Sequence, residues 1–372
     1  VTDVLNSESN SSSGIPSLLS KYNSSGALLW HIELPKSVQV LWHCRLMKNG
    51  NIVAVGFNSE DNSEWVGLAT ISPSGELLKE HSFFNSSRSL PSSYGDNSID
   101  CAILQNGNIA LTMPHSMGSN ISLVPRLVVL DTELNEVFDR RYTPNTIVLE
   151  RDLYQIYMQE DASGNLILNG RDKSTATDTL NYFAFMLKLQ AGSYEPIGFQ
   201  LFHNSGKTSP SSLAISNTDD AIWTSSGPSQ LDSSINYWFN LRNQEKFLIG
   251  STIQAWKVNT TSQITETAAI TGYLKNGFIQ NTKKCESGGY IMVGTCNINT
   301  DQQVPSEYRI LVVKVADDMS VEWIQTPYLS FPTIGADIVE TSDGYLVSAT
   351  HASLGETTRP IVFQIDKNGL IR

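Results

Sequence analysis

Short runs of apolar residues recur throughout the chain, and clusters of Asn, Gly, Ser and Asp separate them. Residues 52–55 are IVAV and residues 127–130 are LVVL, and other runs have a similar length. Runs of roughly four to eight residues with turn residues at both ends predict β-strands, because helices need longer segments with apolar positions three or four apart. Such helical spacing is nearly absent. The pattern therefore predicts an all-β protein.

One hairpin turn is repeated along the chain. Its glycines are Gly50, Gly107, Gly164, Gly289 and Gly344, so that the steps are 57, 57, 125 and 55 residues. Asn-Gly between apolar runs predicts a tight β-hairpin, because both central residues need positive φ. The step of 125 corresponds to two repeats with an insertion. An all-β chain with this period predicts a β-propeller, in which similar sheets repeat around a centre.

Each repeat also has a second hairpin, and the two hairpins together give the number of blades. The second turns lie near residues 26, 75, 134, 192, 262, 318 and 369, and the first turns lie near 50, 107, 164, 219, 288 and 343. We therefore predict a seven-bladed β-propeller with four-stranded antiparallel blades, in which the innermost strand of the first blade is missing from the pattern. Six or eight blades are the alternatives. Residues 1–372 would then form a single domain.

The segment 227–250 breaks the period and lengthens one repeat. Connections of this length are uncommon in compact domains, and those that occur are usually functional or mobile. We therefore expect an inserted loop within the fifth blade.

Charge and composition limit the partners and the compartment. The chain has 25 Lys and Arg against 37 Asp and Glu, a net charge of −12 with His neutral, which disfavours a nucleic acid or an anionic membrane as partner. No apolar run has the length of a membrane span. The many Ser and Asn residues favour an extracytoplasmic protein that is secreted, periplasmic or at the cell surface. The chain opens in mid-pattern at Val1, which is compatible with a lipid anchor upstream of residue 1.

The four cysteines are too few for a disulfide scaffold. Cys44 and Cys101 each lie six residues before a turn glycine, so we expect both at one buried apolar position of the repeat. Cys285 and Cys296 flank one hairpin, but its turn would place Cys285 opposite a residue near Met292. A disulfide between them is therefore not expected.

The second hairpin has a recurring sequence. It is Lys-x-Asn-x-x-Gly-x-x-x-Trp from Lys21 to Trp30, and a variant runs from Lys314 to Trp323. These repeats resemble those of secreted bacterial β-propellers that are common among Bacteroidetes surface lipoproteins, and they are distantly similar to quinoprotein-type propellers. The resemblance implies an exported propeller. Many proteins of this group have no assigned activity, so it implies little about a ligand.

Motifs of the common catalytic and cofactor sites are absent. The chain has no His-Glu-x-x-His, Cys-x-x-Cys or Gly-x-Ser-x-Gly, and no carboxylates are grouped as a quinoprotein calcium site requires. Residues 205–208 resemble the end of a phosphate-binding loop, but Leu201 stands where its first glycine is needed. We therefore expect no cofactor and favour a protein that is not an enzyme.

Several repeats carry a polar residue seven positions before the turn glycine. In a propeller the innermost strand lines the central channel, so these side chains would gather near one mouth and could hold a ligand. The alternative, which the recurrence favours, is that each Asp accepts backbone hydrogen bonds and fixes the start of its own blade. The residues are His43, Asp100, Thr282 and Asp337, with Asp152 at a similar place. A histidine occurs there once, so His43 is the better functional candidate.

The aromatic residues divide into two groups. Trp30 and Trp323 occupy one repeat position, and we expect them to pack between blades. Trp256 lies in a regular strand, and we expect it in the core. Trp42, Trp65 and Trp238 lie at strand starts or in loops, where an aromatic side chain can stack on a sugar ring or anchor a protein. The candidate ligand-binding residues are Trp238, Tyr237, Trp42 and Trp65, together with His43.

Three functions are consistent with these features. The favoured one is a non-catalytic exported propeller that binds a glycan or a protein through loops on one face. The second is a hydrolase or lyase acting on carbohydrate, with Asp100, Asp152 or Asp337 as acids and His43 as general base. The third is a structural interaction scaffold.

Overall fold

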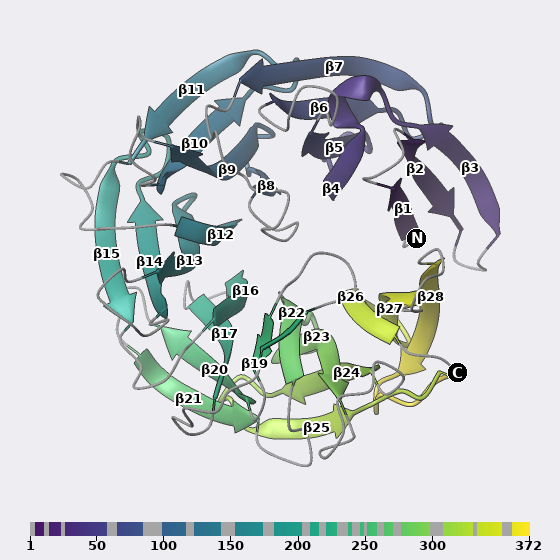
Figure 1. Cartoon of the computed structure of the whole chain (residues 1–372), viewed down its shortest axis with the longest axis vertical. Coiled ribbons are helices and arrows are strands. Elements are labelled where there is room, and N and C mark those ends of the chain that lie inside the picture. Colours follow the sequence, from purple (N-terminus) through teal and green to yellow (C-terminus); the bar gives the residue numbers. More distant parts are fainter. Residues whose placement is uncertain are drawn as a thin grey trace. The chain divides into compact units, whose positions relative to one another are not determined.

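A computed structural model shows that the described chain is built almost entirely from antiparallel β-strands (Figure 1). It describes residues 4–10, 15–23, 27–57, 65–84, 99–116, 123–142, 153–173, 182–202, 209–215, 221–228, 237–239, 246–248, 251–258, 264–270, 277–297, 308–329, 333–351 and 359–372. The all-β prediction is confirmed, and a short 3-10 helix, η1 (Lys36–Val38), is the only helical element among these residues.

The strands belong to two compact units, Val1–Glu160 and Asp161–Arg372, here called unit 1 and unit 2. The strands of unit 1 are β1 (Val4–Asn10), β2 (Ile15–Tyr22), β3 (Leu28–Glu33), β4 (Val40–Leu46), β5 (Ile52–Phe57), β6 (Trp65–Ile71), β7 (Leu77–Phe84), β8 (Asp100–Ile103), β9 (Ile109–Ser116), β10 (Leu123–Leu130), β11 (Glu136–Arg141) and β12 (Leu153–Glu160).

Unit 2 continues the same alternation of strands and turns. Its strands are β13 (Leu166–Lys173), β14 (Tyr182–Leu189), β15 (Pro196–Phe202), β16 (Ser209–Ile215), β17 (Ala221–Pro228), β18 (Tyr237–Phe239), β19 (Lys246–Leu248), β20 (Ser251–Val258), β21 (Ile264–Ile270), β22 (Gly277–Lys284), β23 (Tyr290–Asn297), β24 (Tyr308–Val315), β25 (Val321–Gln325), β26 (Thr333–Thr341), β27 (Gly344–His351) and β28 (Arg359–Asp366).

Successive strands pair in chain order, so that each sheet is an antiparallel meander. Four-stranded sheets are formed by β4–β7, β8–β11, β12–β15, β16-β17-β20-β21 and β22–β25. Two further sheets, β1–β3 and β26–β28, have three strands. The hairpin β18–β19 lies in the segment 227–250, between two strands that pair directly with each other.

The prediction of seven four-stranded blades is wrong, because five of the sheets formed by the described residues have four strands. It rested on counting hairpin turns, and a turn requires only the two strands that flank it. After the turn at Gly369 the chain makes one isolated bridge, between Ile371 and Ile365, instead of a fourth strand. A turn motif therefore predicts a hairpin reliably, but it does not predict the pairing at the outer edge of a sheet.

Several hairpins close through the same side-chain cap. The Oδ1 of Asp131 accepts a hydrogen bond from the N–H of Asn135, four residues later, at 2.9 Å. The Oδ1 of Asp366 accepts in the same way from the N–H of Leu370 at 2.9 Å. The residue directly before each donor, Leu134 or Gly369, has positive φ. Equivalent caps come from Asn23, Ser72 and Asp161. This cap explains why Asn, Asp or Ser precedes the turn residue by three positions.

The shared cysteine position is confirmed. Cys44 pairs with Ala54 and Cys101 with Leu111, which is the same register position in two sheets. Burial raises the pKa of both thiols to about 12, so both stay protonated at neutral pH and react poorly. All four cysteines are free.

Trp30 and Trp323 pack on the neighbouring sheet, as predicted. The indole N–H of Trp30 donates to the carbonyl of Pro73 at 2.9 Å, in the turn between β6 and β7. A Cβ built on Gly75 of that turn would lie 2.9 Å from the Trp30 ring. A Cβ on Gly369 would lie 2.8 Å from Trp323 of the preceding sheet. Glycine is needed at these turns for two reasons. It adopts the positive φ, and its lack of a side chain leaves room for the tryptophan ring that packs on the turn.

We predict that Gly369→Ala destabilises the protein more than Gly192→Ala does. Both glycines have positive φ, at 81° and 74°, and the left-handed conformation costs alanine about 1 kcal/mol. Gly192 has no atom within 4 Å of the built Cβ, whereas at Gly369 both Gln325 and Trp323 must move, which adds about 1–3 kcal/mol. Urea unfolding measures the difference. Equal losses would contradict the packing of Trp323 on this turn.

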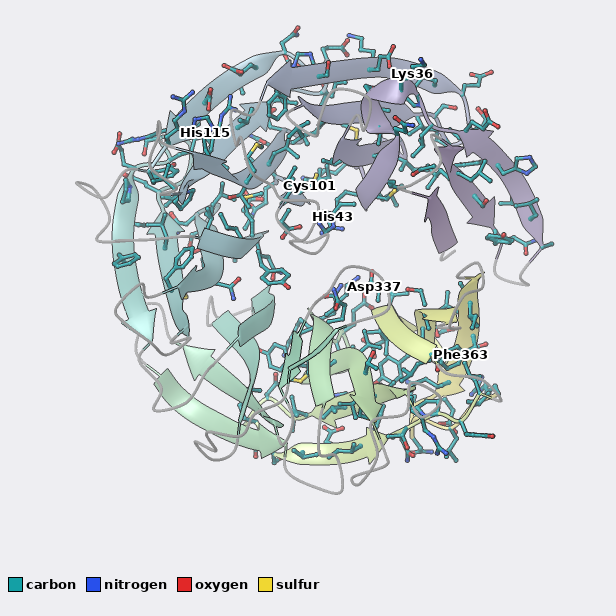
Figure 2. All side chains as sticks on the ribbon, viewed as in Figure 1. Lys36, His43, Cys101, His115, Asp337 and Phe363 are labelled. Atoms are coloured by element: carbon teal, nitrogen blue, oxygen red, sulfur yellow. The ribbon has the colours of Figure 1, made fainter. Side chains whose placement is uncertain are left out.

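A charged pair within the β8–β11 sheet also contacts the neighbouring sheet of unit 1 through its buried arginine. Arg126 on β10 donates two hydrogen bonds to Asp139 on β11, both 2.8 Å long, and its guanidinium lies 5.4 Å from the ring centroid of Phe83 on β7. His115 on β9 is buried in the same unit (Figure 2). Its burial, and then the positive charges of Arg141 and Arg126, lower its pKa from 6.5 to about 4, while Asp139 acts in the opposite direction.

We predict that His115 makes the protein less stable as the pH falls from about 6.5 to about 4. In this interval the unfolded chain takes up a proton that the folded protein refuses, so the free energy of unfolding decreases. Above this interval the imidazole is neutral in both states and contributes no pH dependence. His115→Gln should flatten the stability profile between pH 6.5 and 4, and the exposed His31→Gln is the control. An unchanged slope in His115→Gln would disprove the assignment.

Candidate functional site

A β-bulge recurs in the first strands of several sheets, at one position of the repeat. The extra residue leaves the pairing out of step and re-aims the side chain that follows it. The register shifts lie between Leu41 and His43, Pro210 and Ser212, Ile279 and Asn281, and Gly335 and Asp337. The polar position that the repeat count identified is therefore the residue directly after the bulge.

The register corrects one member of this polar set. Asn281 pairs with Val293 as His43 pairs with Val55, so Asn281 holds the repeated position. Thr282 pairs with Met292 and corresponds to the buried cysteine position. The count was taken from Gly289, whereas Gly288 is the residue whose N–H closes the turn. Thr282 was thus wrong by one residue.

In unit 1 the carboxylate of Asp100 is held on all sides by protein groups. Its Oδ1 accepts from the guanidinium Nη2 of Arg45 at 3.0 Å and from the N–H of Cys101 at 2.7 Å. Its Oδ2 accepts from the N–H of Met158 on β12 at 2.7 Å. The side chain is 8% exposed. Asp100 therefore links three successive first strands, β4, β8 and β12.

His43 lies beside the ion pair of Arg45 and Asp100, and Figure 2 shows it near Cys101 in unit 1. Its Nε2 is 2.6 Å from the carbonyl oxygen of Ile99 and 4.0 Å from Oδ1 of Asp100. A carbonyl oxygen can only accept, so Nε2 carries a proton and donates it. The proton-accepting nitrogen of the neutral ring is then Nδ1. Arg45 also donates to the carbonyls of Cys101 and Cys44, at 2.7 and 3.1 Å.

Unit 2 contains a similar cluster in a more open setting. The amide Nδ2 of Asn281 donates to Oδ1 of Asp337 at 2.8 Å, and Lys283 Nζ lies 3.0 Å from Oδ2 and 2.9 Å from Oδ1 of the same carboxylate. The N–H of Ile338 also donates to Oδ1 at 2.7 Å. Here the side chain of Asp337 is 47% exposed and that of Lys283 is 40% exposed. Figure 2 shows Asp337 on β26.

The two clusters are built in the same way. On one first strand, a cation two residues after the residue that follows the bulge binds the Asp of the next first strand. Arg45 and Lys283 hold this cationic position, and the sequence predictions did not include either residue. Both lie five residues before a turn glycine, Gly50 and Gly288. The same count that identified His43 therefore could have identified them.

Most of the predicted aromatic ligand residues have a known strand but no described side chain. Trp42 is the bulged residue of β4, Trp65 begins β6, and Tyr237 and Trp238 lie on β18. Asp152 lies outside the described residues. Their roles stay predictions. Among the described side chains no group of three His, Cys, Asp or Glu is placed to hold a metal ion. In the same part of the chain no helix is long and apolar enough to cross a membrane.

Comparison with solved structures shows that the fold is a β-propeller. A PL25 ulvan lyase bound to -[GlcA(1-4)Rha3S]- aligns over 91% of this chain and 82% of its own, with a TM-score of 0.59 and 10% identity. The polysaccharide lyase Uly1 aligns over 98% and 88%, with a TM-score of 0.55 and 8% identity. An α-L-arabinofuranosidase from Fusarium graminearum aligns over 98% of both chains, with a TM-score of 0.52 and 10% identity. Identities this low establish the fold alone.

No protein family and no curated protein matches the sequence. The likeness to solved propeller structures nevertheless confirms the predicted β-propeller fold. The resemblance to bacterial surface lipoproteins, the extracytoplasmic location and the bound partner stay predictions.

We predict that Asp100→Ala destabilises the protein much more than Asp337→Ala. The first substitution leaves the guanidinium of Arg45 and two backbone N–H groups without their acceptor in a nearly buried place, which costs about 3 kcal/mol. The second removes an exposed ion pair, which contributes about 1 kcal/mol or less. Thermal and urea unfolding of the two variants test this. Equal losses would contradict the structural role of Asp100.

Proposed function

We propose that this propeller binds a neutral polysaccharide without cleaving it, through the polar cluster of Asn281, Lys283 and Asp337. The observation that carries the proposal is the open state of this cluster. The side chains of Lys283 and Asp337 are 40% and 47% exposed, although hydrogen bonds between two first strands hold them in place. Asp100, at the same position of unit 1, is instead enclosed by protein donors.

The chemistry of the cluster suits sugar hydroxyl groups. A carboxylate accepts hydrogen bonds from hydroxyls, while an amide and an ammonium group donate to them, so the three side chains offer both kinds of contact. The bulge and the register hold these groups in place before a ligand arrives, which reduces the entropy cost of binding. Two propeller neighbours named as polysaccharide lyases support this class of ligand.

The charge of the cluster favours a neutral polymer. Lys283 is compensated by Asp337, and the chain as a whole has a net charge of −12. A polyanion would be repelled by this field and would have to displace Asp337 from the lysine. A polymer that offers hydroxyl groups meets neither obstacle. An extracytoplasmic location, where polysaccharides are met, belongs to the same proposal.

We predict that Asp337→Asn weakens polysaccharide binding at least tenfold, because the amide replaces a strong acceptor and leaves Lys283 uncompensated. Affinity electrophoresis in gels that contain arabinan, dextran or ulvan measures this, and a glycan array widens the panel. We expect retardation by a neutral polymer and none by ulvan.

Asp343→Asn is the matched control. It removes an exposed ion pair with Arg372 in the same sheet, at the turn that joins β26 and β27. Its binding should equal that of the unmodified chain. The proposal fails if the unmodified chain binds none of the polymers on the array, or if the two variants bind equally well.

A catalytic role is the second candidate, and the fixed ring of His43 favours it. The carbonyl of Ile99 holds the proton on Nε2, so Nδ1 is the basic nitrogen, and Arg45 lies two residues further along β4. Asp100 is a poor acid for this role because its oxygens already accept three hydrogen bonds. Reducing-end and unsaturated-product assays on the same polymers decide between the two. Turnover that His43→Gln abolishes would replace binding by catalysis.

A further inference from the structure

Tyr328 is exposed to solvent in the segment that leads to β26, the strand that carries Asp337. After β25 ends at Gln325, residues 326–329 lead toward β26. Pro327 is buried and Leu329 packs against a core cluster that includes Ile338 and Val347. Tyr328 between them is 65% exposed. The flanking residues therefore anchor the backbone while the aromatic side chain stays in water.

The ring of Tyr328 is supported by a cation. The guanidinium carbon of Arg309, at the start of β24, lies 4.7 Å from the ring centroid. A guanidinium over an aromatic face is attracted by the electron density of the ring and restricts its rotation. A fixed and exposed aromatic side chain loses little conformational entropy when a ligand covers it.

Topology puts Tyr328 at the same end of the sheets as the polar cluster. In an antiparallel meander, β22 and β24 both begin at one end of the sheet, and β23 runs back between them. Arg309 is the second residue of β24, and the segment that carries Tyr328 leads to the start of β26. The bulges that position Asn281 and Asp337 lie in the first halves of β22 and β26. Tyr328 with Arg309 and the polar cluster of Asn281, Lys283 and Asp337 therefore lie at the same end of these sheets in unit 2.

We propose that Tyr328, supported by Arg309, is a stacking subsite for one sugar ring of the polysaccharide bound at Asp337. This inference rests on the proposed function and adds a second contact along the polymer. The apolar C–H face of a sugar stacks on an aromatic ring, and the guanidinium offers donors to its hydroxyl groups. Two separated contacts on one polymer act together, so affinity rises once an oligosaccharide is long enough to reach both.

The experiment measures oligosaccharide binding as a function of length. The probes are size-fractionated oligosaccharides of the polymer that retards the unmodified chain, titrated by calorimetry against the unmodified chain, Tyr328→Ala and Tyr328→Phe. We expect Tyr328→Ala to lose about tenfold in affinity for long oligosaccharides and nothing for the shortest that bind. Tyr328→Phe keeps the ring and should keep the affinity. Thermal unfolding verifies that each variant is folded.

The outcomes separate this inference from the proposed function. If Asp337→Asn weakens binding but Tyr328→Ala binds long oligosaccharides as the unmodified chain does, the subsite is wrong and the polysaccharide function stands. If Tyr328→Ala loses the same factor at every length, the tyrosine is part of the primary contact and the separate subsite is wrong. If the unmodified chain binds no polysaccharide, both proposals fall.

Discussion

The antiparallel register of the first strands, interrupted by a bulge, is the constraint on which both polar clusters depend. Pairing alternates the two faces of a strand, so a residue's place in the register decides whether its side chain enters the core or a polar cluster. The bulge before His43, Asn281 and Asp337 shifts that alternation once, at the same place in each repeat. The position that follows packs toward the core and is Cys44, Thr282 or Ile338 in the three strands, partly buried at Cys44 and buried in the other two. Polar-cluster and core side chains thus come from adjacent residues.

One design gives two different environments. In both units a cation on one first strand binds an Asp on the next, which ties successive sheets together. Around Asp100 the N–H of Met158 adds a third strand, and the carboxylate becomes part of the structure. Around Asp337 the amide of Asn281 replaces His43, and the ion pair stays in contact with water. The same repeated arrangement therefore gives a buried link between strands at Asp100 and leaves the carboxylate of Asp337 accessible to solvent.

The hairpins could be predicted because their causes are local. A positive φ at the turn and a side-chain cap three residues before it are both encoded within a few residues, as at Asp366 and Gly369. The clusters were found only in part. His43, Asp100 and Asp337 break the apolar pattern visibly, whereas Arg45 and Lys283 resemble ordinary surface cations until their partners are known. Tyr328 gave no signal, because its support by Arg309 depends on how the segment after β25 lies against the start of β24.

The sequence by itself determined the all-β class, the position of the turns, the propeller fold and the shared site of Cys44 and Cys101. Each of these follows from local backbone preferences repeated at a regular period. Tertiary structure alone decided which sheets complete a fourth strand, since that depends on edge pairing and not on a turn. It also decided which carboxylate is enclosed, because Arg45 and Asp100 meet across 55 residues of chain. Burial of a charge depends on everything packed around it, and no short segment of sequence contains that information.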